Sequence, residues 1–175
     1  EAGGHNGREE ITSMVLIPQV VDAVKIPVIA AGGIIDGRGI AAALALGAAG
    51  VQLGTRFVAT IESSAHENFK QAILNSTPAS TMLMMKKTVP VRLMKNTFYE
   101  EVKKLEDQGA SAEELNQLLG HGRAKAGMLE GDMINGEIEI GQGCSMISDC
   151  PTVEEVVQKL IADYKLTRKS LGDAF

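Results

Sequence analysis

The feature that most constrains the fold of this chain is a helix–strand–helix–strand pattern between residues 14 and 57. Apolar residues at helical spacing over Met14–Lys25 predict a helix, and Ile26–Ala31 is apolar on both faces, as buried parallel strands are. A helix over 39–46 and a second buried strand over Gly50–Thr55 are expected to follow. This repeat implies parallel strands joined by right-handed crossovers. Because two strands do not make a domain, we expect them to belong to a larger sheet.

The pattern changes after Phe57, and we divide the chain into residues 1–62, 63–150 and 151–175. Glycine-rich residues 120–143 are predicted to form loops with short elements, and residues 77–90 fit no single assignment. Capping-box spacing opens two of the later helices, at Ser111 and at Thr152. The helices predicted in this part of the chain cover residues 65–75, 97–108, 111–119 and 152–164.

Composition excludes several classes of function. The 175 residues carry a net charge of −5 and only 3% aromatic side chains, which argues against a nucleic-acid surface. Cys144 and Cys150 have no zinc-ligand spacing, and the histidines are scattered, so no metal site is expected. The uncharged stretch over residues 39–55 fits a helix followed by a buried strand better than a membrane span. With no signal peptide visible, we expect a cytoplasmic protein without a membrane partner.

Two glycine clusters lie at the carboxyl ends of the predicted strands. Gly32 and Gly33 follow the first strand, and Gly54 and Thr55 end the second. In (β/α)₈ barrels this end carries the active site, and the loops after the last strands commonly bind phosphate. Glycine allows the backbone to approach an anion closely, and exposed N–H groups attract it. Each cluster alone is also compatible with a simple turn, but two in register favour phosphate binding.

His5 is the third candidate. It lies in a polar, glycine-flanked stretch after Gly3 and Gly4, where an imidazole can act as general acid, general base or electrostatic partner. The residues alone equally allow an exposed loop histidine. We expect His66 and His121 to be solvated, on a helix and in a loop.

Three ordered motifs together carry a resemblance to a known family. The string EAGGHNG, the string PVIAAGGIIDGRGIAAALALGAAGVQLGTRF and, more weakly, the region Glu137–Gln142 resemble the flavin-dependent nitronate monooxygenases (formerly 2-nitropropane dioxygenases) and the flavin-dependent enoyl-acyl-carrier-protein reductases. The resemblance is strong over residues 1–62. It implies an α/β fold, here the C-terminal part of a TIM (β/α)₈ barrel followed by a helical cap segment, and FMN as cofactor.

The resemblance also implies roles for individual residues. Backbone amides at Gly32, Gly33, Gly54 and Thr55 would hold the FMN phosphate. Gly3 and Gly4 would border the flavin, and His5 would be the active-site histidine facing the ring and the substrate. Gly141 and Gln142 would close over the site.

Three functions follow as hypotheses. The first is an NAD(P)H-dependent, FMN-containing enoyl-acyl-carrier-protein reductase of fatty-acid synthesis, which the segment from Val89 to Gln142 resembles more. The second is a nitronate monooxygenase, in which the nitronate itself reduces the flavin. The third is an inert fragment or a non-enzymatic phosphate-binding subunit.

The partners expected from this resemblance are of two kinds. One is a small-molecule or acyl-carrier-protein-bound substrate. The other is the N-terminal half of the same protein, because family members are about twice as long and their first strands have no counterpart here; a homodimer is a further possibility.

Overall fold

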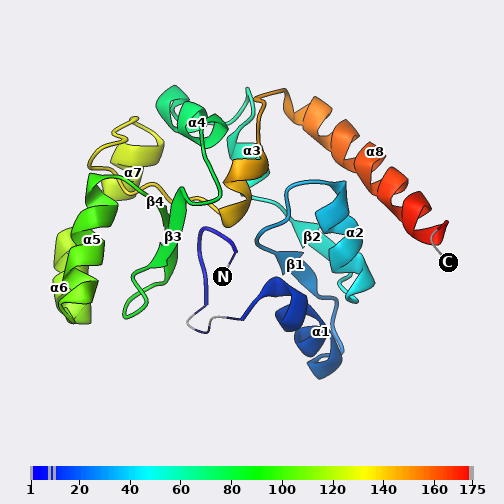
Figure 1. Ribbon diagram of the computed structural model, residues 1–175, viewed down its shortest axis with the longest axis horizontal. Coiled ribbons are helices and arrows are strands. Elements are labelled where there is room, and N and C mark those ends of the chain that lie inside the picture. The colour runs from blue at the N-terminus through cyan, green and yellow to red at the C-terminus, as the bar shows by residue number, and fades with distance from the viewer. Residues whose placement is uncertain (1, 8, 10, 174–175) are drawn as a thin grey trace.

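The computed structural model describes residues 2–7, 9 and 11–173, and it has an α/β fold in two lobes (Figure 1). One lobe contains a parallel strand pair and the other an antiparallel hairpin, and the N-terminal segment lies between them. The helices are α1 (Ser13–Ala23), α2 (Gly37–Ala45), α3 (Thr55–Val58), α4 (Glu67–Leu74), α5 (Thr97–Asp107), α6 (Ala112–Leu119), α7 (Arg123–Met128) and α8 (Val153–Gly172). The strands are β1 (Ile29–Ala31), β2 (Gly50–Gln52), β3 (Thr81–Met84) and β4 (Val91–Met94), and a 3₁₀ helix, η1, covers Gln142–Met146.

The predicted helix–strand–helix–strand repeat is present as α1, β1, α2 and β2. The strands are parallel, with Ile29 opposite Gly50 and Ala31 opposite Gln52. Apolar side chains from all four elements and their connections form one core, built on Ile17, Ala30, Ile34, Ala43 and Ala48. The first strand is shorter than the predicted Ile26–Ala31, and the second is shorter than Gly50–Thr55.

The predicted burial of the first strand on both faces is wrong for this chain. Only Ala30 of β1 is buried, whereas Ile29 is 56% exposed and Ile26, just before the strand, is 73% exposed. The physical reason is that, among the described residues, β1 pairs with β2 alone. One face and one edge of this apolar strand therefore have no covering element within residues 2–7, 9 and 11–173.

Helix α8 crosses α2 at very close range. A Cβ atom on Gly37 would collide with the backbone of Asp163 and Tyr164, so glycine is required at this crossing. Asp36 caps α2 by accepting hydrogen bonds from the amides of Arg38 and Gly39. The helix predicted to end near Tyr164 continues to Gly172, since the added residues contain no helix breaker before that glycine.

The second lobe contains the segment that the sequence left unassigned. Strands β3 and β4 form an antiparallel hairpin, with Thr81 opposite Met94. Helices α5 and α6 pack on it through a core that includes Leu93, Phe98, Val102 and Leu115. Helix α7 is one of the short elements expected in the glycine-rich region 120–143. Both predicted capping boxes, Ser111–Glu114 and Thr152–Glu155, are present.

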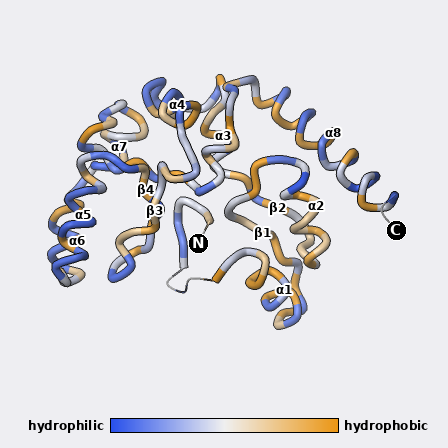
Figure 2. The backbone as a smooth tube through the Cα atoms, in the orientation of Figure 1, coloured by the Kyte–Doolittle hydropathy of each residue, from blue (hydrophilic) through white to orange (hydrophobic). Residues whose placement is uncertain are grey.

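A third core joins the two lobes. Ile35 and Ala59 from the parallel lobe pack with Met94, Ile138 and Ile140 from the other. Figure 2 shows apolar positions gathered along β1 and α2, while hydrophilic positions are frequent in α5 and α6. The buried side chain of Arg56, in α3, donates from Nη1 to Asp149, just before α8, at 2.7 Å.

Two predictions about side chains outside the site have different outcomes. His121 is exposed, as expected, but His66 is half-buried and caps α4, its Nδ1 accepting from the amide of Asn68. Among the described residues, no helix combines the length and the apolar character needed to cross a bilayer.

Candidate functional site

All seven residues predicted from the sequence as site residues line one cavity of about 430 Å³. This volume is within the range of small-molecule and cofactor sites. The cavity lies between the carboxyl ends of β1 and β2, the N-terminal segment and the strand-like segment before η1. The seven residues are Gly3, Gly4, His5, Gly32, Gly33, Gly54 and Thr55; Gly141 lines the same cavity.

Strand β4 positions the N-terminal side of the cavity. The amide of Arg92 donates to the carbonyl of Gly4 at 2.6 Å, and the carbonyl of Arg92 accepts from the amide of Ile140 at 3.1 Å. Antiparallel bridges join His5 to Val91 and Glu139 to Leu93. Two segments that are far apart in sequence therefore lie end to end along one edge of β4.

The glycines after β1 have a steric reason for their identity. Gly32 and Gly33 have φ values of +93° and +74°, which favour glycine. A Cβ on Gly33 would lie 2.9 Å from the Cβ of Ala2, and one on Gly32 would lie 3.1 Å from the amide nitrogen of Gly3. This turn is therefore packed against the N-terminal segment.

Gly54 is different. Its φ is −99°, a value open to any residue, and a Cβ built on it meets no atom within 4 Å. It precedes α3, which has no side-chain cap, so the amides at the start of that helix have no acceptor within the helix. Since neither strain nor packing requires glycine here, the open space in front of its backbone is the feature most typical of a ligand cradle.

The segment predicted to close over the site makes two direct contacts with it. The amide of Gly141 donates to the Thr55 hydroxyl at 3.0 Å, and the amide of Gln142 donates to the carbonyl of Ala2 at 2.8 Å. A Cβ on Gly141 would crowd Thr55 Oγ1, at 2.6 Å. Gly141 and Gln142 thus connect the N-terminal segment to Thr55, after the end of β2, through hydrogen bonds.

Two acidic residues near His5, Glu137 and Glu139, were not predicted as part of the site, and Glu139 is in contact with the imidazole. The imidazole Nδ1 of His5 lies 3.3 Å from Oε2 of Glu139, whose side chain is 12% exposed, whereas that of His5 is 73% exposed. Burial raises the pKa of the Glu139 carboxyl, and His5 opposes that rise. A signal was present in the sequence, since the alternation in Glu137-Ile138-Glu139-Ile140 places both carboxyls on one side of an extended segment.

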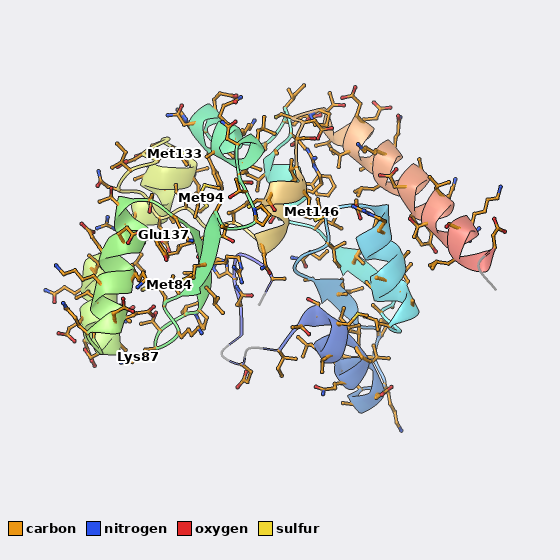
Figure 3. All side chains as sticks on the ribbon, in the orientation of Figure 1. Met84, Lys87, Met94, Met133, Glu137 and Met146 are labelled. Atoms are coloured by element: carbon orange, nitrogen blue, oxygen red, sulfur yellow. The ribbon has the colours of Figure 1, made fainter. Side chains whose placement is uncertain are left out.

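Glu137 is more deeply buried than Glu139. Burial, helped by the negative charge of Glu139, raises the pKa of Glu137 to about 7, while His5 and Arg123 act in the opposite direction. Figure 3 shows Glu137 in the lobe of β3 and β4, together with Met94 and Met133. Both carboxyls, two residues apart, therefore have a raised pKa, and burial is the main cause in each case.

A metal centre does not emerge from this arrangement. Within the part of the chain that the structure describes, no three His, Cys, Asp or Glu side chains are grouped so that they could hold a metal ion. The cavity is lined by backbone amides, the imidazole of His5, the carboxyl of Glu139 and the uncharged polar side chains of Asn6, Ser13, Gln52 and Thr55. This set is suited to binding a phosphate-bearing organic ligand and to proton transfer.

Comparisons with known proteins agree on one family. The family model described as nitronate monooxygenase matches residues 1–163. A probable nitronate monooxygenase of Bacillus subtilis is 38% identical over 168 residues, covering 91% of this chain and 48% of the relative. The structure of FabK from Thermotoga maritima matches with a TM-score of 0.91 and 35% identity, over 99% of this chain and 55% of that one. A nitroalkane oxidase from Streptomyces ansochromogenes matches with a TM-score of 0.77 and 36% identity, over 97% of this chain and 51% of that one.

These similarities confirm the predicted α/β class and the architecture of part of a TIM barrel with an added helical segment. The chain spans between a third and a half of the length of the curated relatives it matches.

The raised pKa of Glu137 predicts how stability depends on pH. In the folded chain this carboxyl keeps its proton up to about pH 7, whereas an unfolded glutamate ionises near its ordinary value of 4.5. The folded state binds more protons between these values, so the free energy of unfolding falls as the pH rises through this window and levels off above it. We expect Glu137→Gln to reduce that fall by about 1–3 kcal/mol, measured by urea denaturation between about pH 5 and pH 8.

The matched control is Glu130→Gln, which changes an exposed carboxyl paired with Lys125. Equal pH dependence in Glu137→Gln and the parent chain would contradict the assignment.

Proposed function

The chain belongs to the nitronate monooxygenase family, and from that premise we propose that it acts in an FMN-dependent oxidoreductase. The observation that carries the proposal is that one cavity is lined both by the strand-end glycines and by His5. A cofactor that carries both a phosphate and a reactive ring matches this combination of groups.

The residues present fit FMN. The phosphate would be held at the backbone of Gly33, Gly54 and Thr55, where the open space before Gly54 admits an anion and no carboxylate of the cavity lies among these residues. Gly3 and Gly4 would border the ring, and His5 would stand at its reactive side. Bound flavin supplies hydride or electron transfer, and the protein supplies orientation and proton handling.

The proposed substrate class is a trans-2-enoyl thioester carried by acyl carrier protein, with NAD(P)H as electron donor. Similarity to FabK over 99% of the chain favours this substrate class. The segment from Val89 to Gln142 favours it too, because it resembles the enoyl-acyl-carrier-protein reductases more than the nitronate monooxygenases. His5 would then polarise the thioester or return a proton to the product.

Nitronate oxidation is the second candidate, favoured by the family model and by the Bacillus subtilis relative. The similarity to nitroalkane oxidase points the same way. In this reading the imidazole of His5 would contact the nitro group or take a proton from the substrate.

Two assays on the full-length, FMN-loaded protein separate the candidates. NAD(P)H oxidation that depends on a crotonyl thioester supports the reductase, and oxygen uptake with a nitronate and without NAD(P)H supports the monooxygenase. A colourless protein that fails both assays and takes up no added FMN would contradict the oxidoreductase proposal.

We also propose that the barrel is completed by a further segment of the same protein. The curated relatives are two to three times as long as the matched region. The exposed side chains of Ile29 in β1 and of Ile26 just before it provide an apolar surface for additional strands and helices. For this reason the functional tests use the full-length protein.

Gly54 offers the cleanest test of the phosphate site. Gly54→Asp should abolish FMN retention in the full-length protein, because its carboxylate would enter the open space and repel the phosphate. The fold should survive, since Gly54 has no close neighbour and no positive φ. The measurement is flavin released per mole of purified protein. Gly172→Ala, also at a glycine with no neighbour within 4 Å, is the control. Stoichiometric flavin in Gly54→Asp would defeat the assignment.

The catalytic role of His5 has its own prediction. His5→Ala should lower turnover by ~10²–10⁴-fold, the usual loss for a positioned acid–base group. FMN retention should stay unchanged, because the proposed phosphate contacts are at Gly33, Gly54 and Thr55 and not at His5. The measurement is the steady-state rate of His5→Ala and of the parent with the active substrate, at equal flavin content. Turnover within about threefold of the parent, under ~1 kcal/mol of barrier, would reduce His5 to a loop residue.

A further inference from the structure

We propose that Glu139 is a positioning residue for His5, holding the imidazole through Nδ1 so that Nε2 is presented to the substrate. The inference rests on the proposed function, in which His5 acts on substrate. It adds the group that sets the orientation and the tautomer of that histidine.

The contact between the two side chains is the first support. Nδ1 of His5 and Oε2 of Glu139 are 3.3 Å apart, and both residues line the cavity. The separation is long for a charge-assisted hydrogen bond, but such bonds are often loose without ligand and tighten in the substrate complex. Among the described residues, Glu139 is the one acidic side chain within ion-pair distance of His5.

The backbone holds this pair in register. His5 is bridged to Val91 and Glu139 to Leu93, two residues apart on the same edge of β4. The amide and the carbonyl of Arg92, between them, bond to the neighbours of the pair, Gly4 and Ile140. The two Cα positions are therefore fixed by main-chain hydrogen bonds, which makes the side-chain contact a property of the fold.

The burial of the two partners is unequal, and this suits a positioning role. The side chain of Glu139 is 12% exposed, so its rotamers are restricted by packing, whereas His5 is open to the cavity. A fixed carboxyl can therefore orient a more mobile ring. The reverse arrangement would leave the ring free to turn away from the substrate.

The chemistry of imidazole fits this role for Glu139. A neutral imidazole carries one N–H, and the partner of one nitrogen decides which nitrogen carries the proton. A carboxylate accepting from Nδ1–H leaves the lone pair on Nε2, which can then take a proton from a bound substrate. When Nε2 gains that proton, the carboxylate stabilises the resulting imidazolium.

The neighbouring carboxyl does not compete for this role. Glu137 is buried, and burial together with the charge of Glu139 raises its pKa to about 7. Glu139 is the carboxyl in contact with the imidazole, and that contact favours its ionised form against the effect of burial.

The first arm of the test reads the tautomer directly and needs no cofactor. In ¹⁵N-labelled full-length protein without FMN, at about pH 8.5, where an ordinary imidazole is neutral, a long-range ¹H–¹⁵N spectrum shows which ring nitrogen of His5 is protonated. We expect Nδ1–H in the parent and Nε2–H in Glu139→Leu. Glu139→Gln, which keeps an acceptor oxygen, should retain part of the Nδ1–H form. Glu130→Leu, at an exposed carboxyl that does not line the cavity, is the control and should match the parent.

The second arm asks whether positioning matters to the reaction. In the FMN-loaded protein, Glu139→Leu should lower kcat by about 10- to 100-fold with little change in KM or in flavin content. Combined with His5→Ala, it should cost nothing further, because Glu139 acts through His5.

The outcomes separate the two proposals. An Nε2–H tautomer in the parent, or the same tautomer in the parent and in Glu139→Leu, overturns the positioning role whatever the enzyme's substrate is. Additive losses in the double variant also overturn it. Failure of both substrate assays, with the tautomer shift as expected, would instead refute the proposed function and leave the geometric assignment of Glu139 in place.

Discussion

The candidate site depends on the pairing of β4 with two segments at once. Through the backbone of Arg92, one strand edge binds Gly4 on one side and Ile140 on the other. Without this pairing, His5 would belong to a free N-terminal segment and Glu139 to a glycine-flanked connection. With it, both face the carboxyl ends of β1 and β2. Because unpaired backbone groups are costly when buried, the shared strand edge is a strong constraint on the geometry of the cavity.

The glycines around this cavity have two distinct physical roles. Gly32 and Gly33 adopt positive φ values and touch the N-terminal segment, so a side chain there would disturb the fold before it disturbed a ligand. Gly54 has neither constraint, and its backbone faces open space. A substitution series that treats all strand-end glycines alike would therefore confuse folding with binding. The distinction comes from φ values and neighbour distances, which a pattern of glycines in a sequence does not contain.

The parts of the structure that rest on local signals were predictable from the sequence. The helix–strand repeat follows from hydrophobic periodicity, the capping boxes at Ser111 and Thr152 from residue spacing, and the shared cavity from the fact that parallel strands end on one side of a sheet. Non-local features were not predictable. The β3–β4 hairpin has no Asn-Gly or Asp-Gly turn from which it could be predicted. The contact between Glu139 and His5 joins segments separated by most of the chain. The burial expected for Ile29 failed because burial depends on neighbours beyond its own strand.

The central claim is that the glycine side of the cavity binds the phosphate of FMN. The most direct test compares the affinities of FMN and riboflavin for the full-length protein, measured by quenching of flavin fluorescence. The two ligands share the ring and differ in the phosphate. Charge-assisted hydrogen bonds to backbone amides predict that FMN binds at least ~100-fold more tightly, about 3 kcal/mol. Equal affinities for the two flavins would contradict the account.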